Sequence, residues 1–184
     1  MSPGAARARM ALVMFVAVLV QTALGDDLRV LGVAPDLMVL VAICGGMFGG
    51  PEAGAWVGFW AGLVADLFLV STPLGLSALT YCLIGFAVGA LRSSVLPEGW
   101  LLTPVLALVA TAAAVVLFVG VGDVVGEHQL IAAGRTWLVK VAVVEGLCNA
   151  VLALPVAWLY RRAARGSKGM ERMGGARADR LSVG

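Results

Sequence analysis

The chain consists of long apolar runs separated by short polar breaks. A membrane-spanning helix needs about 20 mainly apolar residues, and six runs have roughly this length. The runs are too long for strands, and they lack the alternation of polar and apolar positions that a β-barrel requires. We therefore predict an all-α polytopic membrane protein, a six-transmembrane-helix bundle. The predicted spans are residues 9–25, 30–49, 53–72, 74–92, 101–122 and 138–160.

The composition agrees with this prediction. Hydrophobic residues make up 61% of the 184-residue chain and charged residues only 13%, whereas soluble domains carry about 25% charged residues. A single transmembrane bundle over residues 1–160 leaves no room for a separate domain. Residues 161–184 are basic and rich in glycine, and we predict that they form a disordered tail.

The basic tail predicts a surface partner. We expect its first cations to contact anionic lipid headgroups, which attract basic residues near the membrane surface. The alternative is a topological anchor with no further role. The tail has no aromatic side chains to stack bases, so we expect no nucleic-acid partner. The basic residues nearest the bundle are Arg161, Arg162, Arg165 and Lys168.

Basic residues also predict the orientation in the membrane. Arg7 and Arg9 precede the first span, Arg92 follows the fourth, and the tail follows the sixth. Six spans place all of these on one side, so the positive-inside rule predicts that both termini are cytoplasmic. The loop at 49–54 belongs to the same side and has no Lys or Arg. The first span also resembles a signal peptide, but we expect it to remain uncleaved.

Three glycines at intervals of four predict a close helix contact. Gly54, Gly58 and Gly62 form one ridge of the third span, and the next step of four is Asp66. Small residues at this spacing let two helix backbones approach closely within a membrane. We expect this helix-packing ridge to pack inside the bundle. The alternative is a docking seam for a second protein.

Acidic residues inside apolar spans are costly, and each is therefore a candidate site. Asp36, Asp66 and Glu145 all fall about 9–11 Å below the predicted outer boundary, at 1.5 Å per residue. Asn149 lies one turn from Glu145, and Ser77, Thr80 and Tyr81 enter the fourth span at a similar depth. Pro35 is expected to kink the second helix beside Asp36.

Two interpretations of this outer-half polar layer remain open. In the first, Asp36, Asp66, Glu145 and Asn149 line one polar pocket or partner cleft that opens toward the outside. In the second, they make separate interior contacts, with the acids protonated. Both require that the acids are shielded from lipid tails.

The sequence offers little support for catalysis. The single histidine, His128, lies in a predicted loop, and no serine or cysteine has a base at motif spacing. Cys44, Cys82 and Cys148 lie within apolar runs and show no metal-ligand or disulfide spacing. We therefore expect no enzyme activity, no cofactor and no metal site.

Residues 34–91 resemble the core of the rod shape-determining protein MreD family. The resemblance covers about a third of the chain. The elements that carry it are Pro35-Asp36-Leu37 at the start of the second span, the Gly50-Pro51 turn, the run "GFWAGLVADL" ending at Leu67 with Asp66 before it, the Pro73-Leu74-Gly75 turn and "ALTYCLIGF".

This resemblance implies a non-enzymatic component of the cell-wall elongation machinery in the bacterial cytoplasmic (inner) membrane. It implies a single-span MreC-like partner, whose helix the glycine ridge and polar layer would receive, together with the MreB filament and the peptidoglycan synthases. It also implies a bundle similar to the substrate-binding subunit of energy-coupling-factor transporters. The alternative function is accordingly the substrate-binding membrane subunit of a small-molecule, vitamin-type transporter.

Overall fold

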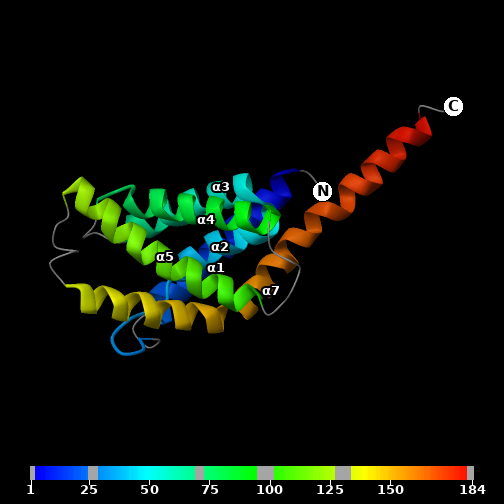
Figure 1. The fold of residues 1–184 in the computed structure, drawn as a ribbon. Coiled ribbons are helices and arrows are strands. Elements are labelled where there is room, and N and C mark those ends of the chain that lie inside the picture. Colours follow the sequence, from blue (N-terminus) through cyan, green and yellow to red (C-terminus); the bar gives the residue numbers. More distant parts are fainter. Residues whose placement is uncertain (1–2, 25–28, 69–72, 95–101, 127–133, 182–184) are drawn as a thin grey trace.

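The computed structural model describes residues 3–24, 29–68, 73–94, 102–126 and 134–181. Its regular structure is entirely helical in these ranges, which confirms the predicted class (Figure 1). Three helical stretches, 76–93, 102–125 and 135–162, are long and apolar enough to cross a membrane. The helices are α1 (Pro3–Leu24), α2 (Leu37–Gly49), α3 (Pro51–Phe68), α4 (Leu76–Ser94), α5 (Leu102–Val125) and α7 (Arg135–Leu181).

The second helix begins later than predicted. Residues 30–33 form a tight turn, in which Val30 and Val33 exchange backbone hydrogen bonds of 2.9 and 3.0 Å. Gly32 has a φ of 84°, a left-handed conformation that glycine adopts without strain. Because α2 starts only at Leu37, Pro35 precedes the helix and does not kink it, contrary to the prediction. A proline before a helix disfavours helical geometry in the residue that it follows.

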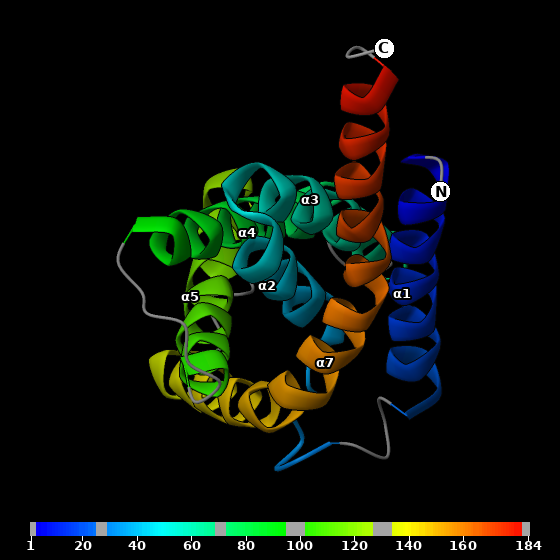
Figure 2. The same cartoon turned by 90° about the vertical axis from the view of Figure 1, so that its right-hand side faces the viewer.

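Helix α2 lies at the centre of the molecule. Figure 2 shows it between α3 and α4 on one side and α7 on the other. All residues of α2 from Leu37 to Met47 are buried. A helix that is apolar all round is typical of the interior of a bundle. Gly50, with a φ of 85°, reverses the chain into α3, and its N–H bonds to Gly46 O at 3.0 Å.

The bundle is apolar outside and contains polar groups inside. Trp56, Phe86 and Val151 point outward and are 65%, 49% and 75% exposed. The buried polar side chains among the described residues are Asp66, Ser77, Thr80, Thr103, Thr111 and Asn149. This distribution suits a protein whose surface meets acyl chains, because lipid offers no hydrogen bonds to polar groups.

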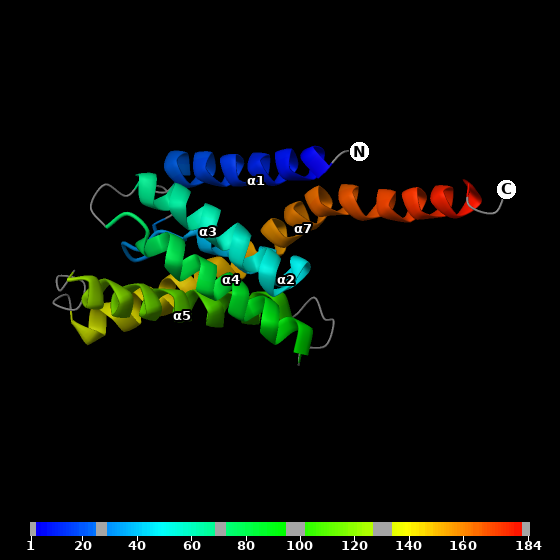
Figure 3. The same cartoon turned by 90° about the horizontal axis from the view of Figure 1, so that it is seen from above.

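The last helix changes direction and extends past the bundle. Pro155 lies inside α7, where a proline removes a backbone hydrogen bond and bends the helix. Beyond it, α7 moves away from α5 and projects from the other helices to Leu181 (Figures 1 and 3). The structure thus has a helix where we expected a disordered tail. Its Arg, Ala and Met residues favour helix formation, whereas its glycines oppose it.

Candidate functional site

Asp36 closes the N-terminus of the central helix. Its Oδ1 accepts hydrogen bonds from Met38 N–H at 2.8 Å and Val39 N–H at 3.2 Å. The first N–H groups of a helix have no partner within the helix, so an aspartate at this position stabilises it. The Leu37 N–H is bound by Gln21 Oε1 of α1 at 2.7 Å. Helix α2 is therefore capped by its own aspartate and by a neighbouring helix.

The same aspartate bonds to two further helices and, through Asn149, is linked to a third. Its Oδ2 accepts a hydrogen bond from the Tyr81 hydroxyl of α4. Its backbone carbonyl accepts one from Asn149 Nδ2 of α7 at 3.1 Å, and the Asn149 amide also donates to Thr111 Oγ1 of α5 at 3.2 Å. These groups lie among apolar helices, where no water is available to bind them. Each hydrogen bond therefore satisfies a polar group that would otherwise be unpaired. We call Asp36, Tyr81, Thr111 and Asn149 the polar junction.

A cavity borders the polar junction. It has a volume of about 250 Å³ and is lined by Asp36, Ser77, Tyr81 and Glu145, with an apolar wall from α5 and α7 that includes Trp137. The Ser77 hydroxyl is buried and has no hydrogen-bond partner in the part of the chain that the structure describes. Glu145 is partly exposed and has no hydrogen-bond partner among the described residues. The cavity therefore offers acceptor and donor groups that the bundle leaves unused.

Asp66 occupies a different place. It is 3% exposed, and it accepts hydrogen bonds from the N–H groups of Gly75 at 2.8 Å, Ser77 at 3.0 Å and Ala78 at 3.2 Å. These groups form the start of α4, where the helix dipole favours a negative charge. Asp66 is therefore a helix cap supplied by the neighbouring helix.

The structure thus brings together only part of the predicted polar layer. Asp36 and Glu145 line one cavity, and Asn149 bonds to the Asp36 carbonyl behind it. Asp66 does not line this cavity, although Ser77 connects the two places, since its N–H binds Asp66 and its side chain faces the cavity. Neither Asp66 nor Asn149 lines this cavity. The acids that we expected to be shielded lie within the bundle, buried or half-buried.

The glycine ridge packs inside the bundle. A Cβ atom added to Gly54, Gly58 or Gly62 would lie 2.2, 2.1 or 2.3 Å from a backbone oxygen of α4. Such distances leave no space for a side chain, so α3 and α4 touch backbone to backbone. The ridge is covered by α4 along its length and is therefore not a free docking seam. Its last step, Asp66, reaches the start of the same helix.

Two residues that form these hydrogen bonds, Gln21 and Thr111, were not predicted from the sequence. Gln21 is one polar residue near the end of an apolar run, and a glutamine near a membrane boundary has no specific meaning by itself. Thr111 lies mid-span, where threonine usually bonds its own helix. Only the depth of Gln21 near the predicted outer end could have suggested its contact with α2.

The remaining predicted residues lie elsewhere. Arg161 and Arg162 are exposed where α7 leaves the bundle. The side chains of Arg165 and Lys168 lie outside the described part of the structure, as does His128. Within the described ranges, no three His, Cys, Asp or Glu side chains are placed to hold a metal ion.

Within the described residues, six helices with an apolar exterior and a polar interior indicate a helical membrane protein. The model of one family, described as rod shape-determining protein MreD, matches residues 6–163. The chain therefore belongs to the MreD family, which confirms the resemblance seen in residues 34–91 and extends it over most of the chain. The family implies a role in rod shape determination and is not a known enzyme family. No curated protein and no solved structure matches the chain.

Proposed function

We propose that this protein is a non-enzymatic scaffold of the cell-wall elongation machinery, which binds a single-span MreC-like partner and the peptidoglycan synthases. The observation that carries the proposal is the family match over residues 6–163. The site supports it, because the polar junction hydrogen-bonds helices to one another.

We infer that the partner engages the cavity beside the polar junction. Ser77 and Glu145 have unused hydrogen-bonding capacity there, and Trp137 supplies an apolar wall. A polar side chain from the partner would be sheltered from lipid in this cavity, where an unpaired polar group is expensive. In this proposal Asp36 and Asn149 shape the cavity, and Asp66 supports the fold.

We also propose that the bundle spans the bacterial inner membrane six times with both termini cytoplasmic. The N-terminus of α1 and the point where α7 leaves the bundle lie at the same end (Figure 3). Arg92, in the last turn of α4, belongs to this end too. A basic end of this kind favours the cytoplasmic side, and the basic residues after Tyr160 would then contact anionic headgroups.

Capture of the partner tests the scaffold. The full chain and its Glu145→Ala variant would each be co-expressed with the MreC-like protein and purified from detergent. We expect Glu145→Ala to recover about tenfold less partner, because a buried polar group left without its hydrogen-bond partner costs about 1–3 kcal/mol. Glu52→Ala is the matched control, since Glu52 is exposed at the opposite end of the bundle. Equal recovery by all three proteins would reject the cavity as the binding site.

A transporter subunit is the second candidate function. The observation in its favour is the same cavity, because about 250 Å³ could enclose a small polar molecule. In that case the bundle would be similar to the substrate-binding subunit of energy-coupling-factor transporters. Such a protein should purify with an ATPase module and a bound metabolite. Recovery of these without an MreC-like protein would replace the scaffold proposal.

A further inference from the structure

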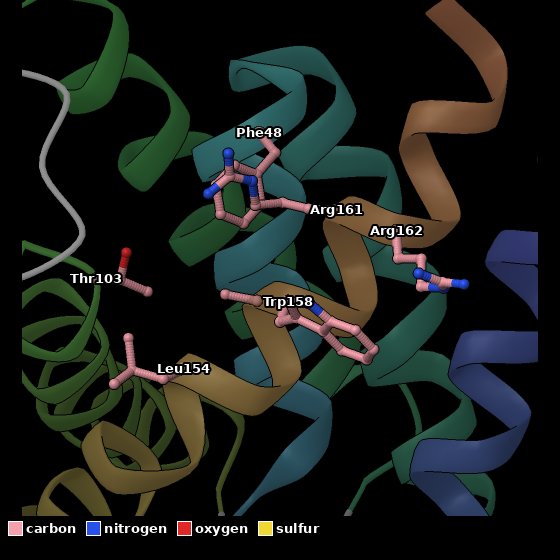
Figure 4. A pocket seen from close by; sticks show the side chains of 7 residues that line it. Phe48, Thr103, Leu154, Trp158, Arg161 and Arg162 are labelled. Carbon is pink, nitrogen blue, oxygen red and sulfur yellow. The ribbon is translucent and has the colours of Figure 1, made fainter.

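A second cavity lies at the opposite end of the bundle from the polar junction. It has a volume of about 410 Å³ and is bounded by the end of α2, the start of α5 and the part of α7 on either side of Pro155 (Figure 4). We call it the arginine pocket. Its lining residues are Phe48, Thr103, Leu154, Ala157, Trp158, Arg161 and Arg162.

Aromatic rings hold both arginines in this pocket. The Arg161 guanidinium carbon lies 5.6 Å from the centre of the Phe48 ring, and that of Arg162 lies 5.6 Å from the Trp158 ring. The Phe48 ring in turn packs on Tyr160, with 5.9 Å between centroids. A cation above a ring is attracted by its negative face, and the in-plane N–H donors of the guanidinium remain available. Among the described residues, no carboxylate pairs with either arginine.

The pocket changes from cationic to apolar with depth. Leu154 lies seven residues before Arg161 on α7, about 10 Å deeper at 1.5 Å per residue. Ala157 lies between them and is small, which leaves room beside the helix. Thr103 faces the pocket from the first turn of α5, where the helix dipole favours an anion. Figure 4 shows Arg161 over Phe48, with Leu154 and Thr103 on the other side.

We propose that the arginine pocket binds one anionic phospholipid. Arg161, on the side of Phe48 and Thr103, holds the phosphodiester, Arg162 on the Trp158 side of α7 adds a second cation (Figure 4), and one acyl chain runs along Ala157 and Leu154 toward the middle of the membrane. The pocket places cations near the membrane surface and apolar side chains below them. This arrangement complements an anionic phospholipid, whose phosphate lies at the surface and whose acyl chains lie below. This is a defined site for a single lipid, distinct from diffuse attraction to a basic tail, and it stands independently of the scaffold role.

The first test distinguishes binding at a defined site from nonspecific electrostatic attraction to the basic segment. The full-length protein in detergent would be titrated with phosphatidylglycerol, and bound lipid counted by native mass spectrometry. We expect Arg161→Gln with Arg162→Gln to weaken binding about 30-fold, because two basic contacts are lost. The control, Arg177→Gln with Arg180→Gln, removes the same charge further along the chain and should weaken binding less than about threefold. Equal weakening by both pairs would overturn the proposal.

The second test leaves every charge in place. Leu154→Trp fills the apolar part of the pocket, and we expect it to weaken phosphatidylglycerol binding about tenfold. Val151→Trp is its control, because Val151 is 75% exposed on the same helix and does not line the pocket. This pair also decides the question if the arginine variants fail to fold. Binding by Leu154→Trp at the wild-type level would reject the pocket.

The third test distinguishes a lipid from a soluble phosphate. We expect phosphatidylcholine to be retained at least tenfold less than phosphatidylglycerol. Glycerol phosphate at millimolar concentration should not displace the bound lipid, because it lacks the acyl chains that the deeper part of the pocket contacts. Displacement by glycerol phosphate would show that the pocket recognises a free anion, and it would overturn the assignment to a lipid.

Discussion

Two aspartates of this protein act as helix caps. Asp36 caps the helix that follows it, and Asp66 caps a helix that begins ten residues further on. In water a cap competes with solvent for the backbone N–H groups. Inside a membrane no solvent competes, so loss of the carboxylate leaves N–H groups without any partner. The two caps should therefore be worth more than caps on a soluble protein.

Removal of the Asp66 carboxylate should destabilise the fold. Asp66→Ala leaves three buried N–H groups at the start of α4 unpaired. We expect a loss of about 3 kcal/mol or more, because each unpaired buried group costs about 1–3 kcal/mol. Unfolding in detergent by increasing sodium dodecyl sulfate would measure it. Glu52→Ala, at an exposed position on the same helix, should change little; a similar loss in both variants would contradict the capping role.

The bond between Tyr81 and Asp36 should appear as an energetic coupling. Tyr81→Phe removes only the hydroxyl that Asp36 accepts from, and Asp36→Ala removes the acceptor. We expect the two losses of stability to be non-additive by about 1 kcal/mol, since hydrogen-bonded partners share one interaction. A double-mutant cycle on detergent-purified protein measures the coupling. Additive losses would mean that this contact contributes nothing to stability.

At the scale of elements, the α3–α4 pair is fixed by glycine. An added Cβ at Gly58 would lie 2.1 Å from the Tyr81 backbone oxygen, which cannot move without shifting α4. Gly120 on α5 is the converse case, because nothing lies within 4 Å of a Cβ placed there. The two positions carry the same residue type for different reasons.

Substitution of these glycines by alanine should separate the two cases. We expect Gly58→Ala to lower the free energy of unfolding by about 3 kcal/mol, at the upper end for overpacking because the obstacle is backbone. Gly120→Ala should be neutral or slightly stabilising, since alanine is the better helix former. Thermal unfolding of the purified variants compares them. A stable Gly58→Ala protein would mean that α3 and α4 can move apart at low cost.

Helices were predictable here, whereas their exact starts and their contacts were less so. The length of the apolar runs predicts the helical class, and the spacing of Gly54, Gly58 and Gly62 predicts a close packing face. The late start of α2 was missed because the turn at 30–33 is itself apolar apart from Gly32. Apolar residues in a turn cannot be told from apolar residues in a span by hydropathy.

The sequence predicts the depth of the polar residues in the membrane, but it does not predict which residues they hydrogen-bond to. Mid-span acids must be shielded, and this physical rule correctly identifies residues such as Asp66 as unusual. The partner of each acid depends on which helix lies beside it, and hydropathy carries no such information. Asn149 meets the Asp36 carbonyl across 113 positions of sequence. No local sequence pattern predicts a hydrogen bond between residues so far apart in the chain.

At the scale of the whole molecule, the even number of crossings in our proposal places both termini on one side. The two ends of the bundle differ in charge, with Arg92, Arg161 and Arg162 at one end and the acidic caps toward the other. We expect a fluorescent protein fused to either terminus to fluoresce in the cytoplasm and alkaline phosphatase fused there to be inactive. Active phosphatase at the C-terminus alone would indicate an odd number of crossings.

The hydrogen bonds of Asp36 can form only in a certain order while the chain is being synthesised, because their partners lie at different points along the sequence. The contacts to Met38 and Val39 can form as soon as α2 leaves the ribosome, whereas the tyrosine contact must wait for α4. The asparagine reaches the carbonyl only after nearly all of the bundle has been made. The centre of the protein is thus sealed by its last span, and a nascent chain that stops short of α7 keeps an open, polar core.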